Sequence, residues 1–338
     1  MKREEVLKRL MFQVPDKKKK RVIISTDIAN EADDPFAIMH HLLTPSEDVR
    51  AIISAHFDGF CKMAEDRLKA GDAKPEELDF LNMLYSDRGK TEERSYAVGE
   101  KLMELCGIDD VPLIHGSRYE INDENDLPES PGADFIIEEA MRDTDSHLYI
   151  AMLGAATDVA IALLKRPEIA ERMTCIWIGG GMYPQGGPEF NMMQDYKASC
   201  IVLESPVPLW QVPINMYTTM DVSQAELAYS LRNCGDLGSW LCDLVQEVNF
   251  RFGDQGIDSG FPHGETWSLG DNPSVTTLLM GRGRDNYYER KAPKIDQDYN
   301  YIDDPDGKMI RVYENVDPRL TMSDLFSKMQ LCYGKNKE

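Results

Sequence analysis

Apolar runs of strand length alternate with helical patterns along most of this chain. Such alternation is typical of βα units and of a largely parallel sheet. The sequence therefore predicts an α/β fold, Rossmann-like, with a mostly parallel central sheet flanked by helices. The predicted strands are 22–25, 49–55, 111–114, 148–153, 174–178 and 208–212. The predicted helices are 35–43, 92–106, 133–141, 156–164, 194–203 and 237–252.

The chain shows no internal repeat, low-complexity tract or linker, so we expect a single domain over residues 1–338. Residues 60–90 are polar with a helical tendency and read as a helical insertion. The stretch 253–264 is rich in glycine and predicts a mobile loop. Near the end, a Pro-Asp-Gly turn at 304–307 predicts a small C-terminal hairpin of 299–303 and 309–313, within a peripheral segment 285–338 that ends in a helix.

Charge and composition exclude several classes of partner. The formal net charge of −22 disfavours nucleic acid, because binding a phosphate backbone needs clustered Lys and Arg. No apolar run approaches the ~20 residues that span a bilayer, so we expect no membrane partner. The seven cysteines contain no C-x-x-C pair and predict neither a disulfide framework nor a zinc site. Together these features predict a cytoplasmic protein.

Four acidic residues follow the first predicted strand within eight positions: Asp27, Glu31, Asp33 and Asp34. Pro35 then opens a helical pattern. Crowded carboxylates repel one another, and a bound cation or hydrogen-bond donors usually offset that cost. A solvated acidic turn is the alternative, but it fits poorly after a buried strand, whose end commonly forms the site in α/β folds. The loop therefore predicts a metal or substrate site.

Three further polar segments follow predicted strands. Taken singly, each has a plain structural explanation: Asp271 as a helix cap, Glu189 as a surface acid, and the glycines at 179–181 as a tight turn. Because strand ends meet at one edge of a parallel sheet, the four segments together predict an oxygen-rich pocket for a hard cation and a hydroxylated ligand. The three segments are 153–158, 177–192 and 267–273.

Familiar phosphate and hydrolase motifs do not explain this pattern. Gly179-Gly-Gly181 lacks the G-x-G-x-x-G spacing and no Walker lysine follows it. A haloacid-dehalogenase phosphatase would need an aspartate where Ser25 stands, and the G-x-S-x-G of a serine hydrolase is absent.

The ordered motifs resemble those of the calcium-dependent nucleoside hydrolases, the inosine-uridine-preferring nucleoside N-ribohydrolase superfamily. The resemblance covers roughly residues 20 to 280, and the long acidic loop with Asn30-Glu31 resembles a divergent branch. It implies the nucleoside hydrolase fold and an N-glycosyl hydrolase (EC 3.2.2.-) that serves purine or pyrimidine salvage. The matching segments are Ser25-Thr-Asp-Ile-Ala-Asn-Glu-Ala-Asp-Asp34, Gly154-Ala-Ala-Thr-Asp158, Gly179-Gly-Gly181, Glu189-Phe-Asn191, Asp195-Tyr-Lys-Ala198 and Asp271-Asn-Pro273.

The resemblance also implies roles for individual residues and a Ca²⁺ cofactor. Asp27 would be the general base that takes a proton from a calcium-activated water. The sugar hydroxyls of a nucleoside or related ribosyl substrate would be held by Asp33, Glu189, Asn191 and Asp271. Calcium would be held by the carboxylates of Asp27, Asp34 and Asp271 and by the carbonyl of Thr157. Family members are commonly dimers or tetramers, which implies a possible homodimer or homotetramer.

One departure bears on the leaving group. Many members place a His just before the last metal Asp, where it can protonate the departing base, but here that residue is Gly270. His263, a little upstream, is the candidate replacement, and Trp267 could stack on a base. Two alternatives follow: a non-catalytic, metal-dependent nucleoside or sugar-binding protein that has lost the acid, or a hydrolase of a different glycoside. The nucleobase preference is not readable from these residues.

Overall fold

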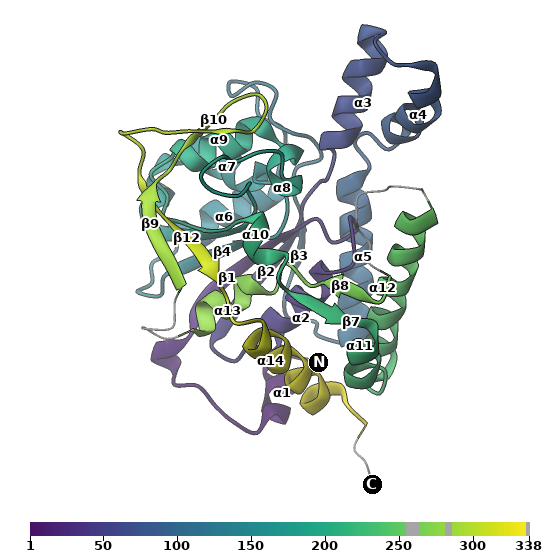
Figure 1. The fold of residues 1–338 in the computed structure, drawn as a ribbon. Coiled ribbons are helices and arrows are strands. Elements are labelled where there is room, and N and C mark those ends of the chain that lie inside the picture. Colours follow the sequence, from purple (N-terminus) through teal and green to yellow (C-terminus); the bar gives the residue numbers. More distant parts are fainter. Residues whose placement is uncertain (255–263, 281–285, 336–338) are drawn as a thin grey trace.

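The structure is a computed structural model, and it describes residues 1–254, 264–280 and 286–335. Within these residues the central sheet has eight strands in the order β3-β2-β1-β4-β5-β6-β12-β9 (Figure 1). Neighbouring strands are parallel, except that β9 runs antiparallel to β12. The predicted α/β fold with a mostly parallel sheet is confirmed. The strands are β1 (Lys20–Thr26), β2 (Glu47–Ser54), β3 (Leu113–His115), β4 (Leu148–Met152), β5 (Met173–Ile178), β6 (Leu209–Val212), β9 (Asn286–Lys291) and β12 (Met309–Asn315).

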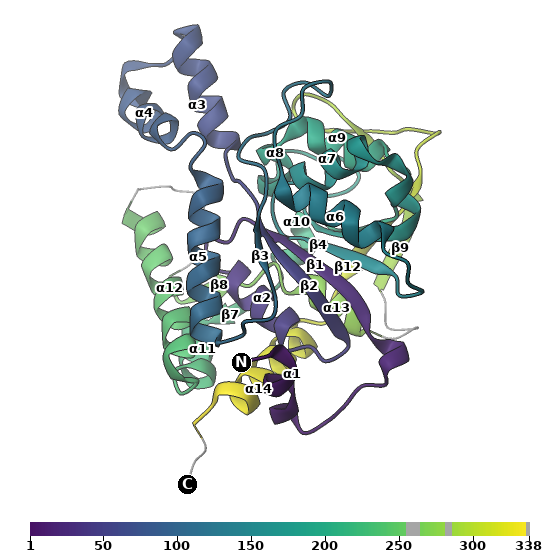
Figure 2. The same ribbon diagram turned by 180° about the vertical axis from the view of Figure 1, so that it is seen from behind.

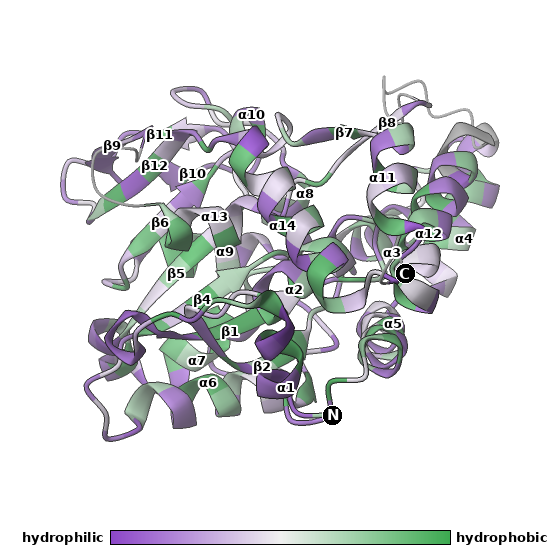
Figure 3. Ribbon diagram, turned by 90° about the horizontal axis from the view of Figure 1, so that it is seen from below, coloured by the Kyte–Doolittle hydropathy of each residue, from purple (hydrophilic) through white to green (hydrophobic). Residues whose placement is uncertain are grey.

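Helices cover both faces of the sheet, as the views from the front and from behind show (Figures 1 and 2). The alternating side chains of β1 explain why: Val22 and Ile24 belong to one core cluster and Ile23 to the other. Since the inner strands are buried on both sides, they are almost continuously hydrophobic, as Figure 3 shows. The helices are α1 (Arg3–Leu7), α2 (Asp34–Leu42), α3 (Gly59–Ala70), α4 (Leu78–Ser86), α5 (Thr91–Cys106), α6 (Pro131–Met141), α7 (Thr157–Lys165), α8 (Phe190–Gln194), α9 (Tyr196–Glu204), α10 (Ile214–Tyr217), α11 (Gln224–Leu231), α12 (Gly235–Asp254), α13 (Pro273–Leu279) and α14 (Pro318–Tyr333).

The strand order reverses at β1, which lies between β2 and β4. In open α/β sheets, ligands bind outside the carboxyl ends of the strands at such a switch point. The register places Ser25, near the end of β1, beside Met152 at the end of β4. Asp27, the residue directly after β1, therefore lies where folds of this kind bind their ligands.

The C-terminal segment differs from the sequence prediction in one respect. A small antiparallel hairpin is present, but its strands are β10 (Lys294–Ile295) and β11 (Tyr301–Ile302). The run predicted as its second strand forms β12 instead, which extends the central sheet between β6 and β9. Ile310 and Val312 of β12 are buried in the core cluster that also holds Leu209 of β6. A peripheral hairpin could not bury these two side chains, which explains why residues 309–315 join the central sheet.

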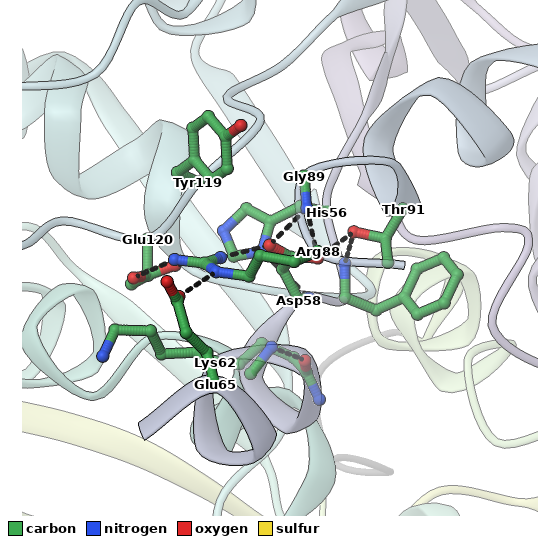
Figure 4. A network of polar contacts seen from close by, with 12 residues as sticks. His56, Asp58, Lys62, Glu65, Arg88, Gly89, Thr91, Tyr119 and Glu120 are labelled. Carbon is green, nitrogen blue, oxygen red and sulfur yellow. Dashed lines mark hydrogen bonds and ion pairs between the residues drawn. The ribbon is translucent and has the colours of Figure 1, made fainter. Parts of the chain in front are cut away.

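Residues 59–86 form the helices α3 and α4, which project from the body of the molecule (Figures 1 and 2). The base of this projection is fixed by Arg88, whose guanidinium lies between carboxylates from α3, from the residue before it and from the loop after β3 (Figure 4). A short antiparallel pair, β7 (Asp221–Ser223) with β8 (Thr266–Ser268), leads into α13. None of the described helices is both long and apolar enough to cross a membrane.

Candidate active site

Three aspartates from distant parts of the chain meet at the carboxyl edge of the sheet. Asp33 and Asp34 lie at the start of α2, and Asp271 lies between β8 and α13. One carboxylate oxygen from each lies within 4.8 Å of the others. With Asp27, which follows β1, all four side chains are buried, with exposed fractions of 1–5%. The structure thus brings together the first and the last of the polar segments found in the sequence.

Local hydrogen bonds shape the acidic loop. The carbonyl of Asp27 accepts from the N–H of Asn30 at 2.7 Å, which closes a turn directly after β1. The Thr26 hydroxyl donates to Oδ1 of Asp34. The Asp33 carbonyl accepts the N–H groups of the first helical turn at 3.0 and 3.2 Å, while Pro35 occupies a position where no N–H is needed. The loop therefore holds both aspartates at the N-terminus of α2, where the helix dipole favours negative charge.

Burial dominates the electrostatics of this cluster. It raises the pKa of Asp27, Asp33 and Asp271 well above the ordinary value, and the neighbouring carboxylates raise these pKa values further. The pKa of Asp34 rises only to about 6, because the Thr26 hydroxyl stabilises its charged form. Burial and the charge of Asp34 raise the pKa of Glu31 to about 8. Without a counter-ion, burial and mutual repulsion therefore favour the protonated forms of these carboxyl groups.

The donor set fits a hard cation. Among the described residues, Oδ2 of Asp27 is buried and makes no hydrogen bond. An unpartnered buried carboxylate oxygen is costly, and coordination of a cation removes that cost. Every side-chain donor in the cluster is a carboxylate oxygen, the ligand type that calcium and magnesium prefer. The residues present therefore suit a divalent cation of this kind.

Gly154, just after β4, allows the Asp27 carboxylate to lie against the neighbouring strand end. A Cβ atom at position 154 would lie 2.9 Å from both Cγ and Oδ1 of Asp27. Real Cβ atoms do not approach so closely, so any larger residue would displace the carboxylate or the loop. The second sequence segment therefore contributes its backbone to the site.

Glu189 and Asn191 border the same edge from the loop after β5. Glu189 caps α8 and is fully engaged: its Oε2 accepts from Gly180 N at 2.7 Å and Met192 N at 3.0 Å. Its Oε1 accepts from Asn191 N at 3.2 Å. The Asn191 Nδ2 group donates to the carbonyls of Leu153 and Ile178, both at 2.9 Å, and so ties together the ends of β4 and β5. Glu189 is 1% exposed, which excludes the surface-acid explanation.

Tyr217, at the end of α10, is a site residue that the sequence analysis missed. Its hydroxyl donates to Oε1 of Glu189 at 2.8 Å. Its ring lies beside Gly270, where a Cβ atom would be 3.0 Å from Cδ2 of Tyr217 and 3.4 Å from Oδ2 of Asp33. Tyr217 thus lies where a longer side chain at position 270 would project. Its place a few residues after β6, at the same sheet edge, is the signal that could have identified it.

The hydroxyl of Thr157, a predicted calcium ligand through its carbonyl, makes its contacts outside the acidic cluster. Thr157 is the first residue of α7, and its hydroxyl donates to Oδ2 of Asp195 at 2.9 Å and contacts Nε2 of His56 at 2.8 Å. In the described part of the chain, neither of these hydroxyl contacts reaches an aspartate of the cluster, and a role for the Thr157 carbonyl stays a prediction. His263 lies outside the described residues.

The His56 contact connects the acidic edge to the network in Figure 4. His56 accepts at Nδ1 from the N–H of Asp58 at 3.3 Å, so its Nε2 is the donor to Thr157. Burial lowers the pKa of His56 to about 4, which keeps the ring neutral. Asp58 in turn holds the guanidinium of Arg88 and the N–H of Gly89. These contacts fix the base of α3 beside the start of α7.

Solved structures share this fold over nearly the whole chain. A plant nucleoside hydrolase superposes with a TM-score of 0.65 at 18% identity, covering 93% of this chain and 99% of that protein. The type III effector XopQ, solved with adenosine diphosphate ribose, superposes with a TM-score of 0.64 at 13% identity, covering 98% and 99%. At these identities the likeness establishes the fold alone. The class of protein comes instead from the family model that matches the sequence, which describes nucleoside hydrolases, a group of N-glycosyl hydrolases.

Sequence comparisons place the chain within that class. The family model described as inosine-uridine preferring nucleoside hydrolase matches residues 22–280. The pyrimidine-specific ribonucleoside hydrolase RihA of Salmonella paratyphi B is 25% identical over 238 residues, 67% of this chain and 69% of the relative. An uncharacterised protein of Schizosaccharomyces pombe is 29% identical over 105 residues, 30% of this chain and about a third (34%) of that protein. The chain belongs to the nucleoside hydrolase family, and β12 and α14 lie beyond the matched residues.

Proposed function

We propose that this enzyme hydrolyses the N-glycosidic bond of a nucleoside or related ribosyl compound, with a bound calcium ion and with Asp27 as general base. The observation that carries the proposal is the buried cluster of Asp27, Asp33, Asp34 and Asp271 at the switch point of the sheet. Family membership supplies the reaction class, and the oxygen-only donor set supports the choice of metal.

Three carboxylates would hold the cation: those of Asp27, Asp34 and Asp271, with the Thr157 carbonyl as a predicted fourth donor. Calcium would position the attacking water and lower its pKa. The Asp27 carboxylate would also accept the proton that this water loses. Cation binding favours the charged form of Asp27, which opposes the rise in its pKa caused by burial.

The ribose would be held from two sides. Asp33 and Asp271 face the site from the acidic cluster, and Glu189 and Asn191 border it from the loop after β5. The amide nitrogen of Asn191 already serves two backbone carbonyls, so its Oδ1 would accept a sugar hydroxyl. Cleavage of the glycosidic bond develops positive charge on the sugar, and the surrounding carboxylates would stabilise that charge.

Leaving-group activation would fall to His263, because Gly270 has no proton to give. Tyr217 is poorly suited to that step. Burial and the charge of Glu189 raise its pKa, so its hydroxyl keeps its proton and acts as a hydrogen-bond donor.

Release of free ribose from a panel of purine and pyrimidine nucleosides tests the proposal. We expect turnover that is lost on chelation and restored by calcium, and that falls by about 10²–10⁴-fold in Asp27→Ala. Asp243→Asn, at an exposed ion pair with Arg232, is the control and should keep wild-type turnover. Absence of turnover across the whole panel, with calcium present, would overturn the hydrolase proposal.

Gly270 also supports a second candidate, a metal-dependent nucleoside or sugar-binding protein without turnover. Calorimetric binding of ribose or nucleoside with no released base would support it, whereas turnover would exclude it. We further propose a single domain, a cytoplasmic location and a homodimer or homotetramer. Light scattering of the purified chain tests the last of these.

A further inference from the structure

Two adjacent histidines, His40 and His41, lie fully buried on the last turn of α2. The same helix begins with Asp34, and the proposed mechanism gives neither histidine a role. Burying two imidazoles is costly unless all their ring nitrogens find partners. The partners they find come from the segment directly after Asp271, from the start of β2 and from the C-terminal helix.

His40 connects the segment of Asp271 with α14. Its Nδ1 lies 3.1 Å from Oδ1 of Asn272, and its Nε2 lies 2.9 Å from Oδ2 of Asp324 on α14. Asn272, the residue directly after Asp271, is itself fully buried. Its Nδ2 donates to the Leu269 carbonyl at 3.3 Å, which leaves Oδ1 to face the histidine. The ring therefore fixes the residue next to a proposed metal ligand.

His41 repeats this arrangement one residue later. Its Nε2 lies 2.9 Å from the hydroxyl of Ser274, which donates to the carbonyl of Asp271 at 2.6 Å. Its Nδ1 lies 2.6 Å from Oε2 of Glu47, at the start of β2. Both side chains of this pair are completely buried. The backbone of Asp271 is thus tied to α2 through a second, independent contact.

The C-terminal helix holds both ligand-bearing segments at once. Asp324 also contacts Lys328, whose Nζ donates to the Thr44 hydroxyl after α2 at 2.9 Å. Thr321, on the same helix, shares a hydrogen bond of 2.8 Å with Thr276 of α13. The contacts between the α2 region and α14 join residues 284 positions apart, and α14 lies beyond the residues matched by the family model. An apolar interface would pack these helices equally well, so the buried polar groups are better explained by the orientation that they impose.

We propose that His40, paired with Asp324 of the C-terminal helix, is a positioning residue for the metal site and holds Asp271 in place opposite Asp34. This inference rests on the proposed calcium site. Groups that orient metal ligands in this way typically change metal affinity by about 10–100-fold when removed. We therefore expect α14 to act on calcium affinity, although it contributes no ligand itself.

Calorimetric titration of the metal-free full chain with calcium alone tests this. The variants are His40→Phe, which removes both ring nitrogens, and Asp324→Asn, which removes the charge at a side chain that is 26% exposed. Glu139→Gln is the matched control, because Glu139 is a buried carboxylate paired with Arg21 and Arg50 at the opposite edge of the sheet. Circular dichroism and urea unfolding report folding separately from affinity. Should His40→Phe fail to fold, Asp324→Asn decides the question.

We expect calcium binding to weaken by about 10–100-fold in Asp324→Asn and His40→Phe, and to stay within twofold of wild type in Glu139→Gln. Affinities in both variants equal to that of the control would overturn the positioning role and leave the calcium proposal intact. Absence of calcium binding by the wild-type chain would overturn the calcium proposal, and the inference with it. Stability losses alike in all three variants, without a change in calcium affinity, would show a purely structural role.

Discussion

The backbone N–H of Asp271 donates a hydrogen bond to Oδ2 of Asp33 at 3.2 Å. This contact joins residues 238 positions apart and closes the acidic cluster between the first and the last of its segments. The N–H dipole also points at the Asp33 carboxylate, and so offsets part of the repulsion among the carboxylates of the cluster.

Gly154→Ala should impair the site without touching a proposed ligand. The added Cβ would meet the Asp27 carboxylate at 2.9 Å, so Asp27 must move. We expect at least tenfold lower kcat and weaker calcium binding, since misplacement by about 1 Å can cost 10²-fold. Steady-state kinetics and calorimetry measure both. Gly71→Ala, which strains the backbone at φ 71° in open space after α3, should lose stability but keep activity. Equal kinetics for the two variants would contradict this prediction.

Tyr217→Phe should weaken the sugar side of the site. The change removes the donor that contacts Oε1 of Glu189 at 2.8 Å and leaves that buried oxygen with one partner fewer. Loss of such a bond costs about 1–3 kcal/mol, which corresponds to a fall in kcat/KM of roughly 5- to 150-fold. Tyr229→Phe, at an exposed tyrosine on α11, serves as the control. Kinetics unchanged in Tyr217→Phe would show that Glu189 keeps its orientation without the phenol.

Gly270→His should not create a working proton donor. The new Cβ would lie 3.0 Å from the Tyr217 ring and 3.4 Å from the Asp33 carboxylate, so the Tyr217 ring must shift to admit the imidazole. We expect a lower Tm and lower activity than wild type. Removing the Tyr217 ring in the double variant Gly270→His/Tyr217→Ala should recover part of the lost stability. A double-mutant cycle measures this non-additive result. Strictly additive losses would show that the two positions do not compete for space.

Calcium should stabilise the protein more at pH 8 than at pH 5. Burial raises the pKa of Asp34 to about 6, so at pH 5 this group holds a proton that a cation must displace. Burial also raises the pKa of Asp27 and of Asp271 well above the ordinary 3.8, which acts in the same direction. The rise in Tm on adding calcium should therefore grow between pH 5 and pH 8. Calorimetry in paired buffers measures it, and Asp34→Asn should remove most of the effect.

Without calcium, the protein itself should become less stable as pH rises from 5 to 8. The folded chain binds these protons more tightly than the unfolded chain, whose aspartates ionise near 3.8. Stability gained from this difference is complete below pH 4 and is lost as pH rises through about 6. Asp158 and Asp195, whose pKa values burial also raises to about 6, add to the same loss whether or not calcium is present. A metal-free Tm that rises steadily from pH 5 to pH 8 would contradict this account.

The sequence by itself determined the fold class and the chemistry of the acidic edge. Strand and helix periods are local properties, and because parallel strands end at one edge, the polar residues after each strand could be assigned to one site. Asp33, Asp34 and Asp271 meet as this reasoning requires. Gly154 lies against Asp27 at the same edge, although the distance between them is known only from the structure.

Only the tertiary structure decided the rest. Tyr217 beside Gly270, β12 inside the sheet and His40 between Asn272 and Asp324 all join residues far apart in the chain. The local sequence pattern cannot identify such partners, because a hydrophobic strand or a buried histidine is compatible with many neighbours. Tertiary packing determines which one it contacts. The chemistry of the site was therefore readable from residue types and spacing, whereas the arrangement that orients it depends on long-range packing.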